Sequence, residues 1–308
     1  MNNHIRLHNG GYAGAVDPHG AGLRSLTHNS ADLIEPSSGV EGSAFAGALL
    51  APWPNRIGDA TYDFDGTQHR LPANESRRGH AIHGLAYALD WDVLETSADR
   101  VRLGVQVPTQ PGWPFRLALA VQYQVGDEGL TALLEATNTG DTRLPYGCGT
   151  HPYLVCGDGT FDDAELTLPA ATRLETDERM LLTGAAPVEQ INADFRTPSR
   201  IGDRFLDHCF TDIAAGEHGV SSAVLQRPGG RGVAISWGSW APWVQVHTPV
   251  RDAPAEHRHG LAVEPMSCPP DAFRSGTGLV VLDPGERHTA WWRIEATLSD
   301  MSATHVQP

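Results

Sequence analysis

The chain has 308 residues and a formal net charge of −15. A charge this negative argues against nucleic-acid phosphates and anionic membrane surfaces as partners. All 22 basic residues are arginine, and the absence of lysine excludes Schiff-base catalysis, lysine-anchored pyridoxal phosphate and a P-loop.

Glycine and proline occur along the whole chain, with 33 and 22 residues. Many of them separate short apolar runs, a pattern that favours short strands and turns over long helices. The first 50 residues are rich in Gly and Ala, and we expect short strands there that pack on something larger. Alternation on both sides of Asp65-Gly66 predicts a β-hairpin over 62–71.

Clean alternation of apolar and polar residues begins at Val101. It predicts strands with one buried face at 101–107, 117–125 and 130–136, the last two joined by a turn at 126–129. Later runs predict further strands at 233–237, 243–247, 279–282 and 291–298. Residues 178–182 offer at most a turn or two of helix.

No linker divides the chain and no internal repeat is evident. We therefore expect one all-β domain over residues 1–308, most simply a single large antiparallel β-sandwich. The polar end of the chain, from about residue 299, is expected to be frayed.

The four cysteines form no CxxC pair, so a zinc knuckle or a dithiol redox motif is not expected. The N-terminus has no apolar signal-peptide core, and no run approaches the roughly 18 apolar residues of a membrane span. These features indicate a cytoplasmic protein with free thiols.

A histidine and a glutamate beside the candidate motifs each stand directly before a proline. His151 precedes Pro152, and Glu264 precedes Pro265. Proline disfavours the helical region for the residue before it, so both side chains are expected on extended backbone. A histidine and a carboxylate held in this way could face each other across a pocket as an acid and a base.

Polar clusters beside turn signals form five candidate site segments. They are Trp53-Pro54-Asn55-Arg56-Ile57-Gly58, Gly79-His80-Ala81-Ile82-His83-Gly84, the His151-Pro152-Tyr153 stretch, Leu206-Asp207-His208-Cys209-Phe210 and the Glu264-Pro265 stretch. In this order and approximate spacing they resemble the aldose 1-epimerase (galactose mutarotase) family, from about Trp53 to Ile294. Single motifs of this kind are weak, whereas five in order are specific.

The resemblance implies the large β-sandwich of that family and an isomerase that interconverts the anomers of a free aldose. It implies that Glu264 is the general base and His151 the general acid. It further implies a set of sugar-binding or site-lining residues, namely Arg56, His83 and Asp207, together with Asn55, Tyr153 and Gln245. Neither a metal nor a cofactor is implied, and the partner is a small sugar.

The chemistry of anomer interconversion suits these residue types independently. Ring opening removes a proton from the C1 hydroxyl and delivers one to the ring oxygen, which a carboxylate and a histidine can do near neutral pH. Arginine and histidine can donate hydrogen bonds to sugar oxygens, and an aspartate can accept from sugar hydroxyls. Tryptophans could cover the apolar face of a sugar, with Trp53, Trp240 and Trp243 as candidates.

Each residue also has a plainer interpretation. His80 and His83 could be a metal pair, but side chains three apart on a strand point to opposite faces, so no metal site is expected. His80 is more simply structural or a support for the site. Whether Arg77 and Arg78 help to bind the sugar is left open.

Other functions remain as alternatives. Glycoside hydrolysis needs two carboxylates, which Asp207 and Glu264 could supply, but it leaves His151 unexplained. A carbohydrate-binding module could keep the pocket without turnover. The sugar itself is open between galactose, glucose and a phosphorylated or sulfonated hexose. The oligomeric state is also open, with a homodimer as one alternative.

Overall fold

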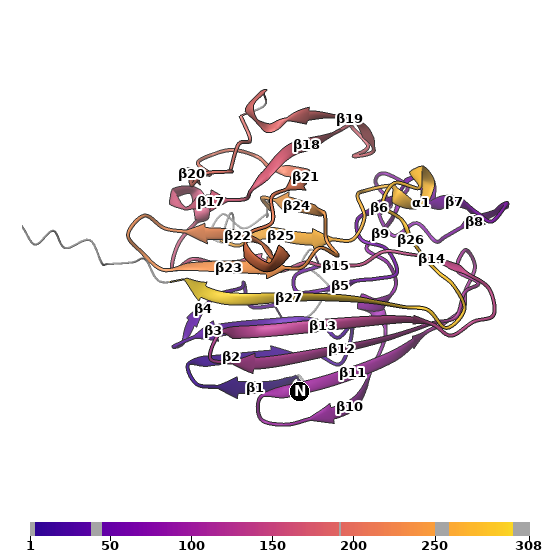
Figure 1. The fold of residues 1–308 in the computed structure, drawn as a ribbon, viewed down its shortest axis with the longest axis horizontal. Helices are drawn as coiled ribbons and strands as arrows, with labels where there is room; N and C mark the ends of the chain where they lie inside the picture. The colour runs from indigo at the N-terminus through magenta and orange to yellow at the C-terminus, as the bar shows by residue number, and fades with distance from the viewer. Residues whose placement is uncertain (1–3, 38–44, 191, 250–258, 298–308) are drawn as a thin grey trace, which may run out of the picture.

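The structure is a computed structural model that describes residues 4–37, 45–190, 192–249 and 259–297. Two large sheets dominate it, and every ladder between their strands in these ranges is antiparallel (Figure 1). The only α-helix in the described ranges is the single turn α1 (Ala272–Ser275). None of their helices has the length and apolar composition needed to cross a membrane. The predicted all-β sandwich class is confirmed.

The larger sheet has nine strands and carries most of the clean alternation in the sequence. Its order is β10 (Asp92–Thr96), β11 (Arg100–Val107), β12 (Leu117–Gly126), β13 (Gly129–Asn138), β27 (Arg287–Thr297), β23 (Gly232–Trp237), β22 (Ser221–Gln226), β17 (Glu165–Thr167) and β20 (Ser199–Arg200). The strands expected at 101–107, 117–125, 130–136, 233–237 and 291–298 are all here, with bounds shifted by a few residues. The last expected strand ends at Thr297, and the predicted tail lies outside the described residues.

The second sheet has eight strands and carries the site. Its order is β19 (Leu182–Pro187), β18 (Ala170–Thr176), β21 (Asp207–Ile213), β24 (Trp243–His247), β25 (Leu261–Met266), β15 (Gly149–Thr150) and β5 (Leu49–Leu50), with β16 (Tyr153–Leu154) also paired to β25. The prediction for 243–247 is confirmed residue for residue. No helix forms at 178–182, within the limit of a turn or two that the sequence set; these residues form the tight turn between β18 and β19 and the start of β19.

Smaller sheets complete the described fold. They are the sheet of β1 (Ile5–Asn9), β2 (Tyr12–Val16), β3 (Leu23–His28) and β4 (Ala31–Asp32), and the pairs β14 (Leu144–Tyr146) with β26 (Val280–Leu282), β6 (Arg56–Ile57) with β9 (Ala81–Ile82), and β7 (Thr61–Phe64) with β8 (Thr67–Arg70). The pair β7–β8 is the hairpin predicted around Asp65-Gly66. Five 3-10 turns lie between strands, at Gly58–Ala60, Ala86–Ala88, Phe161–Asp163, Val188–Gln190 and Glu217–Gly219.

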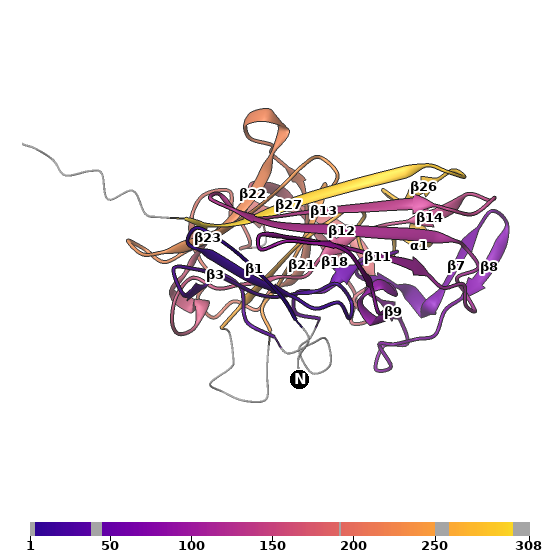
Figure 2. The same ribbon diagram turned by 90° about the horizontal axis from the view of Figure 1, so that it is seen from below.

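The N-terminal sheet packs on the large sheet, as expected for short strands that need a larger partner. Strands β1 and β2 contact β12, and Figure 2 shows them alongside β11–β13. The Tyr123 hydroxyl on β12 donates a hydrogen bond of 2.9 Å to the Ala21 carbonyl in the turn before β3. Tyr123 is 1% exposed, so this contact lies inside the core.

A continuous hydrophobic core fills the space between the sheets. Strand alternation places one set of side chains in it, for example Leu134 on β13, while the next-door Leu133 points to solvent. The core cluster includes residues from both large sheets, for example Trp237, Trp292 and Val244. All four cysteines are free and buried, as expected.

Candidate active site

The eight-stranded sheet presents a row of polar side chains on the face away from the core. In its register Cys209 on β21 pairs with Gln245 on β24, which pairs with Glu264 on β25. Side chains of directly paired residues point to the same face of the sheet. Residues two positions apart on one strand also share a face. Asp207 and His247 therefore lie beside this row, while Val244 and Val246 point into the core.

A break in the edge pairing of β25 brings His151 to Glu264. Strand β15 pairs with β25 at Met266, and β16 pairs with it at Ala262 and Leu261. The residues between β15 and β16 are His151 and Pro152, so they lie beside the centre of β25 on the side that does not pair with β24. Pro265 has no N–H to donate and is tolerated there because no ladder bond is required on that side.

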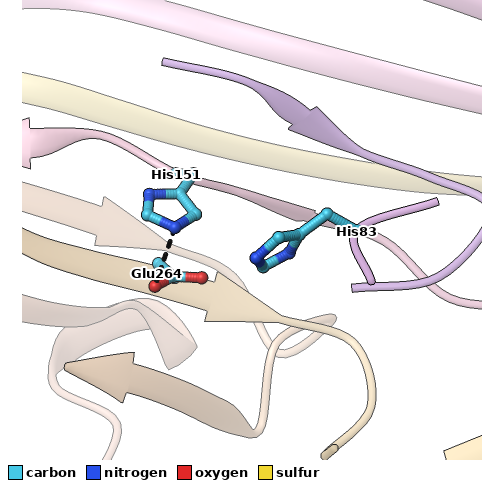
Figure 3. A group of neighbouring side chains, drawn as sticks. All are labelled: His83, His151 and Glu264. Atoms are coloured by element: carbon cyan, nitrogen blue, oxygen red, sulfur yellow. Dashed lines mark ion pairs between the residues drawn. The ribbon is translucent and has the colours of Figure 1, made fainter. Parts of the chain in front are cut away.

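The imidazole of His151 and the carboxylate of Glu264 are in direct contact. His151 Nε2 lies 3.3 Å from Glu264 Oε1, and the side chains are 5% and 2% exposed. Figure 3 shows this contact, with the ring of His83 beside it. His151 Nδ1 and Glu264 Oε2 have no hydrogen-bond partner among the described residues. His151 and Glu264 thus form a buried pair, in the arrangement expected from the sequence.

Burial controls the protonation of this pair. It lowers the pKa of His151 to about 3, with the nearby His247 adding to the effect. It also raises the pKa of Glu264 well above its usual value, and the charge of Asp207 contributes. Both shifts have the same physical cause, because a charged group loses its hydration inside the protein. Both shifts therefore favour the neutral form of each group.

His83 comes from a strained turn after β9. Its φ is 65°, and that of Asn55 is 52°, in the left-handed region that few side chains adopt. Each residue holds the other, since the His83 N–H donates to the Asn55 carbonyl at 2.9 Å and the Asn55 N–H donates to His83 Nδ1 at 3.3 Å. Burial lowers the pKa of His83 well below its usual value, so its ring is neutral.

The hydrogen bond from Asn55 decides which nitrogen of His83 carries a proton. A backbone N–H can only donate, so Nδ1 accepts and Nε2 carries the hydrogen of the neutral ring. His83, His151 and Glu264 have ligand atoms within 4.8 Å of one another, a spacing that could hold a metal ion. A metal-ligating histidine usually donates its other N–H, whereas His83 Nδ1 accepts one. The donor set therefore fits a metal poorly.

Arg56 is held by a glutamate that sequence reasoning missed. Its Nε and Nη2 donate to Glu75 at 2.9 and 3.1 Å, and its Nη1 lies 3.3 Å from Asn55 Oδ1. Burial alone would raise the pKa of Glu75, but the guanidinium groups of Arg56 and Arg78 outweigh it and lower that pKa. Arg56 is thus a hydrogen-bond donor in a fixed position, and Glu75 occupies the Nε–Nη2 edge of its guanidinium group.

Asp207 is oriented from its own sheet. Gln245 Nε2 donates to Asp207 Oδ1 at 2.7 Å, and His247 Nδ1 lies 3.6 Å from the same oxygen. Gln245 thereby holds one carboxylate oxygen, and the Asp207 side chain is 19% exposed. A carboxylate fixed in this way is suited to accept hydrogen bonds from hydroxyl groups.

These side chains line one open cavity of about 240 Å³. All eight residues predicted from the sequence lie on it: Asn55, Arg56, His83, His151, Tyr153, Asp207, Gln245 and Glu264. Sequence reasoning missed five further lining residues, Phe45, Asn74, Glu75, Ile82 and His247. His247 could have been found, because it lies two residues after Gln245 on one strand. Phe45 and Glu75 carry no such signal.

The tryptophans proposed as a sugar platform are elsewhere. Trp53 packs against Trp113 and Phe273 in the core, and none of Trp53, Trp240 and Trp243 lines the cavity. The apolar part of the wall includes Phe45 and Ile82 instead, and the ring centroid of Phe45 lies 4.6 Å from that of His83. The prediction failed because aromatic residues beside a site motif can also face the core.

The architecture is that of the galactose mutarotase-like β-sandwiches. The galactose 1-epimerase from Lactobacillus acidophilus superposes with a TM-score of 0.80 at 22% identity, over 96% of this chain and 94% of that one. A family model for aldose 1-epimerase matches residues 3–295. The chain belongs to the aldose 1-epimerase family.

Relatives cover almost the whole chain. The uncharacterized protein YihR of Escherichia coli (strain K12) is 34% identical over 292 residues, which are 94% of this chain and 92% of that protein. Human galactose mutarotase is 25% identical over 276 residues, covering 81% of this chain and 78% of its own.

Proposed function

We propose that this protein is an aldose 1-epimerase that interconverts the α and β anomers of a free aldose by acid–base ring opening. The observation that carries the proposal is the buried contact of 3.3 Å between His151 and Glu264. The pair lies on a cavity that is also lined by other hydrogen-bonding side chains, among them Arg56, His83 and Asp207. Two similar proteins, the galactose 1-epimerase of Lactobacillus acidophilus and human galactose mutarotase, bear names that agree with this proposal.

In the proposed reaction Glu264 takes the proton of the C1 hydroxyl while His151 gives a proton to the ring oxygen. The C1–O5 bond breaks and C1 becomes an aldehyde carbon. After rotation about C1–C2, the ring oxygen attacks the other face of the aldehyde. It returns its proton to His151, and Glu264 returns its proton to O1. The enzyme is unchanged, and general acid–base catalysis of this kind typically contributes ~10²–10⁴-fold.

The two proton distributions of the pair correspond to the two stages of this reaction. With the ring closed, Glu264 is ionised and His151 is protonated. With the ring open, Glu264 holds the proton and His151 is neutral, which is the distribution that burial favours in the cavity. Transfer of the proton between Glu264 Oε1 and His151 Nε2 would convert one proton distribution into the other without any outside acid.

The remaining residues would bind the sugar. The neutral His83 offers its Nε2–H, Arg56 offers the edge of its guanidinium that Glu75 leaves open, and Asp207 accepts from hydroxyls. Asn55, Tyr153 and Gln245 complete the wall, with Gln245 holding Asp207 in place.

Polarimetry on freshly dissolved α-anomers tests the proposal directly. The panel contains glucose, galactose, a hexose 6-phosphate and a sulfonated hexose, each corrected for its spontaneous rate. Acceleration of at least one aldose is expected. If every sugar binds but keeps its spontaneous rate, the protein is a carbohydrate-binding module and the catalytic proposal is wrong.

The same protein should be incubated with aryl glycosides. Asp207 and Glu264 are two of the carboxylates that line the cavity, and two is the minimum that glycoside hydrolysis requires. An epimerase should release no aryl alcohol, because its reaction breaks and re-forms only the C1–O5 bond of the sugar ring and leaves the bond to the aryl group intact. Release of aryl alcohol that disappears in Asp207→Asn would favour hydrolysis.

A further inference from the structure

We propose that His80 is a positioning residue that ties two walls of the sugar cavity together, an inference that rests on the proposed function. His80 is completely buried and does not line the cavity. It lies three residues before His83 and immediately precedes β9. The proposal explains why a polar ring occupies a fully buried position outside the cavity.

Both ring nitrogens of His80 are satisfied by groups far apart in sequence. The Asp59 N–H donates to Nδ1 at 3.1 Å, and Nε2 lies 3.0 Å from the Arg179 carbonyl oxygen. The first group can only donate and the second can only accept. One neutral tautomer, with the hydrogen on Nε2, therefore makes both bonds at once.

The first wall contains Glu75. The backbone groups of His80 and Glu75 bond in both directions, at 3.0 Å from the Glu75 N–H and 3.4 Å from the His80 N–H. The Glu75 carboxylate lines the cavity and holds Arg56, so the backbone of His80 positions this ion pair. Arg78 donates to the same carboxylate at 2.7 Å.

The second wall contains Asp207. Strands β18 and β21 pair antiparallel, so the C-terminal end of β18 lies beside the end of β21 that begins with Asp207. The turn at 177–181 continues from that end of β18, and Figure 1 shows it reaching toward β6 and β9. Arg179 belongs to this turn, so the bond from His80 to its carbonyl joins the Asp207 sheet to the Glu75 segment.

The side chain of Arg179 strengthens the same junction from the surface. Its Nη2 donates to Asp59 Oδ1 and, at 3.1 Å, to the Arg78 carbonyl. The turn is therefore held at three points on the segment 59–80. The junction sets the distance across the cavity between the acceptor Asp207 and the donor Arg56, which a bound sugar must span.

Three variants test the role. His80→Ala removes both ring contacts, and His80→Gln keeps an amide N–H for the Arg179 carbonyl. Arg179→Ala removes only exposed contacts, because its side chain is 46% exposed. The matched control is Arg200→Ala, which deletes an exposed arginine–aspartate pair with a backbone contact in the other sheet.

The first readout is mutarotation kinetics on the aldose that the wild-type protein turns over fastest. His80→Ala and Arg179→Ala should raise KM about threefold to tenfold while kcat stays within about twofold, since each lost hydrogen bond is worth about 1 kcal/mol. His80→Gln should recover part of the loss, and Arg200→Ala should have no effect. An unchanged KM in folded His80→Ala, or a fall in kcat alone, would overturn the proposal.

The second readout is hydrogen exchange by mass spectrometry, which needs no substrate. Peptides covering 59, 75–80 and 177–181 should exchange faster in His80→Ala and Arg179→Ala than in the wild type or Arg200→Ala. If the wild-type protein accelerates no mutarotation, the proposed function fails while this readout still tests the junction. If His80→Ala does not fold, Arg179→Ala decides, and unchanged exchange there contradicts the proposal.

Discussion

At the scale of single residues, the site depends on charges that the fold makes costly. Glu264 and His151 are almost completely buried, and among the described residues neither forms an ion pair with an arginine. A buried ionisable group without a salt bridge is stable mainly in its neutral form. The acid–base pair is therefore expected to be essential for turnover and unfavourable for stability.

Glu264→Gln and His151→Asn should each remove most of the catalysed rate, by ~10²–10⁴-fold. Because the two groups act in one event, the double variant should be barely slower than the slower single variant. Polarimetry on variants shown by circular dichroism to be folded measures this. Losses that multiply fully in the double variant would show that the residues act independently.

The stability of Glu264→Gln should depend on pH in a defined direction. Burial raises the pKa of Glu264 above its unfolded value, so the folded state binds the proton more tightly. This stabilisation is present below the unfolded pKa of about 4.5 and is lost as pH rises toward the folded pKa. The amide of the variant cannot ionise, so its stability does not fall in this way. Relative to the wild type, its free energy of unfolding should therefore increase by about 1–3 kcal/mol between pH 5 and pH 8.

Urea denaturation at pH 5, 6.5 and 8 measures that gain. The control is Glu217→Gln, which changes an exposed glutamate in a 3-10 turn and should show no such trend. A gain that shrinks as pH rises would mean that Glu264 is more stable ionised in the folded protein.

Exhaustive chelation should leave mutarotation unchanged. The hydrogen bond from the Asn55 N–H occupies His83 Nδ1, so Nε2 keeps its hydrogen and cannot ligate a metal without losing it. Activity is measured before and after treatment with a chelator, followed by addition of zinc. Loss of activity that zinc restores would assign His83, His151 and Glu264 as ligands.

At the scale of elements, strand alternation decides which face of each sheet is packed. Neighbouring residues on β13 differ in their exposure to solvent, with Leu134 1% exposed and Leu133 37% exposed. The same rule on β24 sends Val244 and Val246 into the core and Gln245 and His247 to the cavity. A single strand thus contributes to stability with one face and to the site with the other.

Leu134→Ala should destabilise the protein by about 2–5 kcal/mol, because it removes buried methyl groups and leaves a cavity in the core. The matched control Leu133→Ala, on the opposite face of the same strand, should change stability by no more than about 0.5 kcal/mol. Urea denaturation monitored by circular dichroism gives both values. Equal losses would contradict the assignment of faces.

At the scale of the whole molecule, the site is assembled from segments that span residues 45–264. The core cluster beneath it contains residues of both large sheets. We propose that the described chain is one domain, because neither sheet could keep its inner face from water without the other.

A single domain should lose its core and its site together. In urea, tryptophan fluorescence and mutarotase activity are expected to change with the same midpoint, since Trp237 and Trp292 belong to the core that supports β24 and β25. Both signals are recorded on the same samples after equilibration. Activity lost at a clearly lower urea concentration would show that the site segments unfold as a separate unit.

The sequence by itself predicted the longer strands with clean alternation and a set of residues that line one cavity. Alternation with period two is a local property, so 243–247 and the hairpin at Asp65-Gly66 were predictable without tertiary information. The five motifs contain seven of the predicted residues that line one cavity, and the resemblance adds Gln245 as an eighth. Short strands such as β5, β15 and β16 were not predictable, since two residues show no period.

Only the tertiary structure decided which distant residues meet. Glu75 reaches Arg56, and Phe45 reaches His83, through loops whose paths depend on packing and not on local pattern. His80 contacts Arg179 because the β18–β19 turn is brought over β9. The contact between His151 and Glu264 arises because two short strands pair with β25 on either side of a gap. Pairing of this kind depends on long-range hydrogen bonds and burial, which no local stretch of sequence encodes.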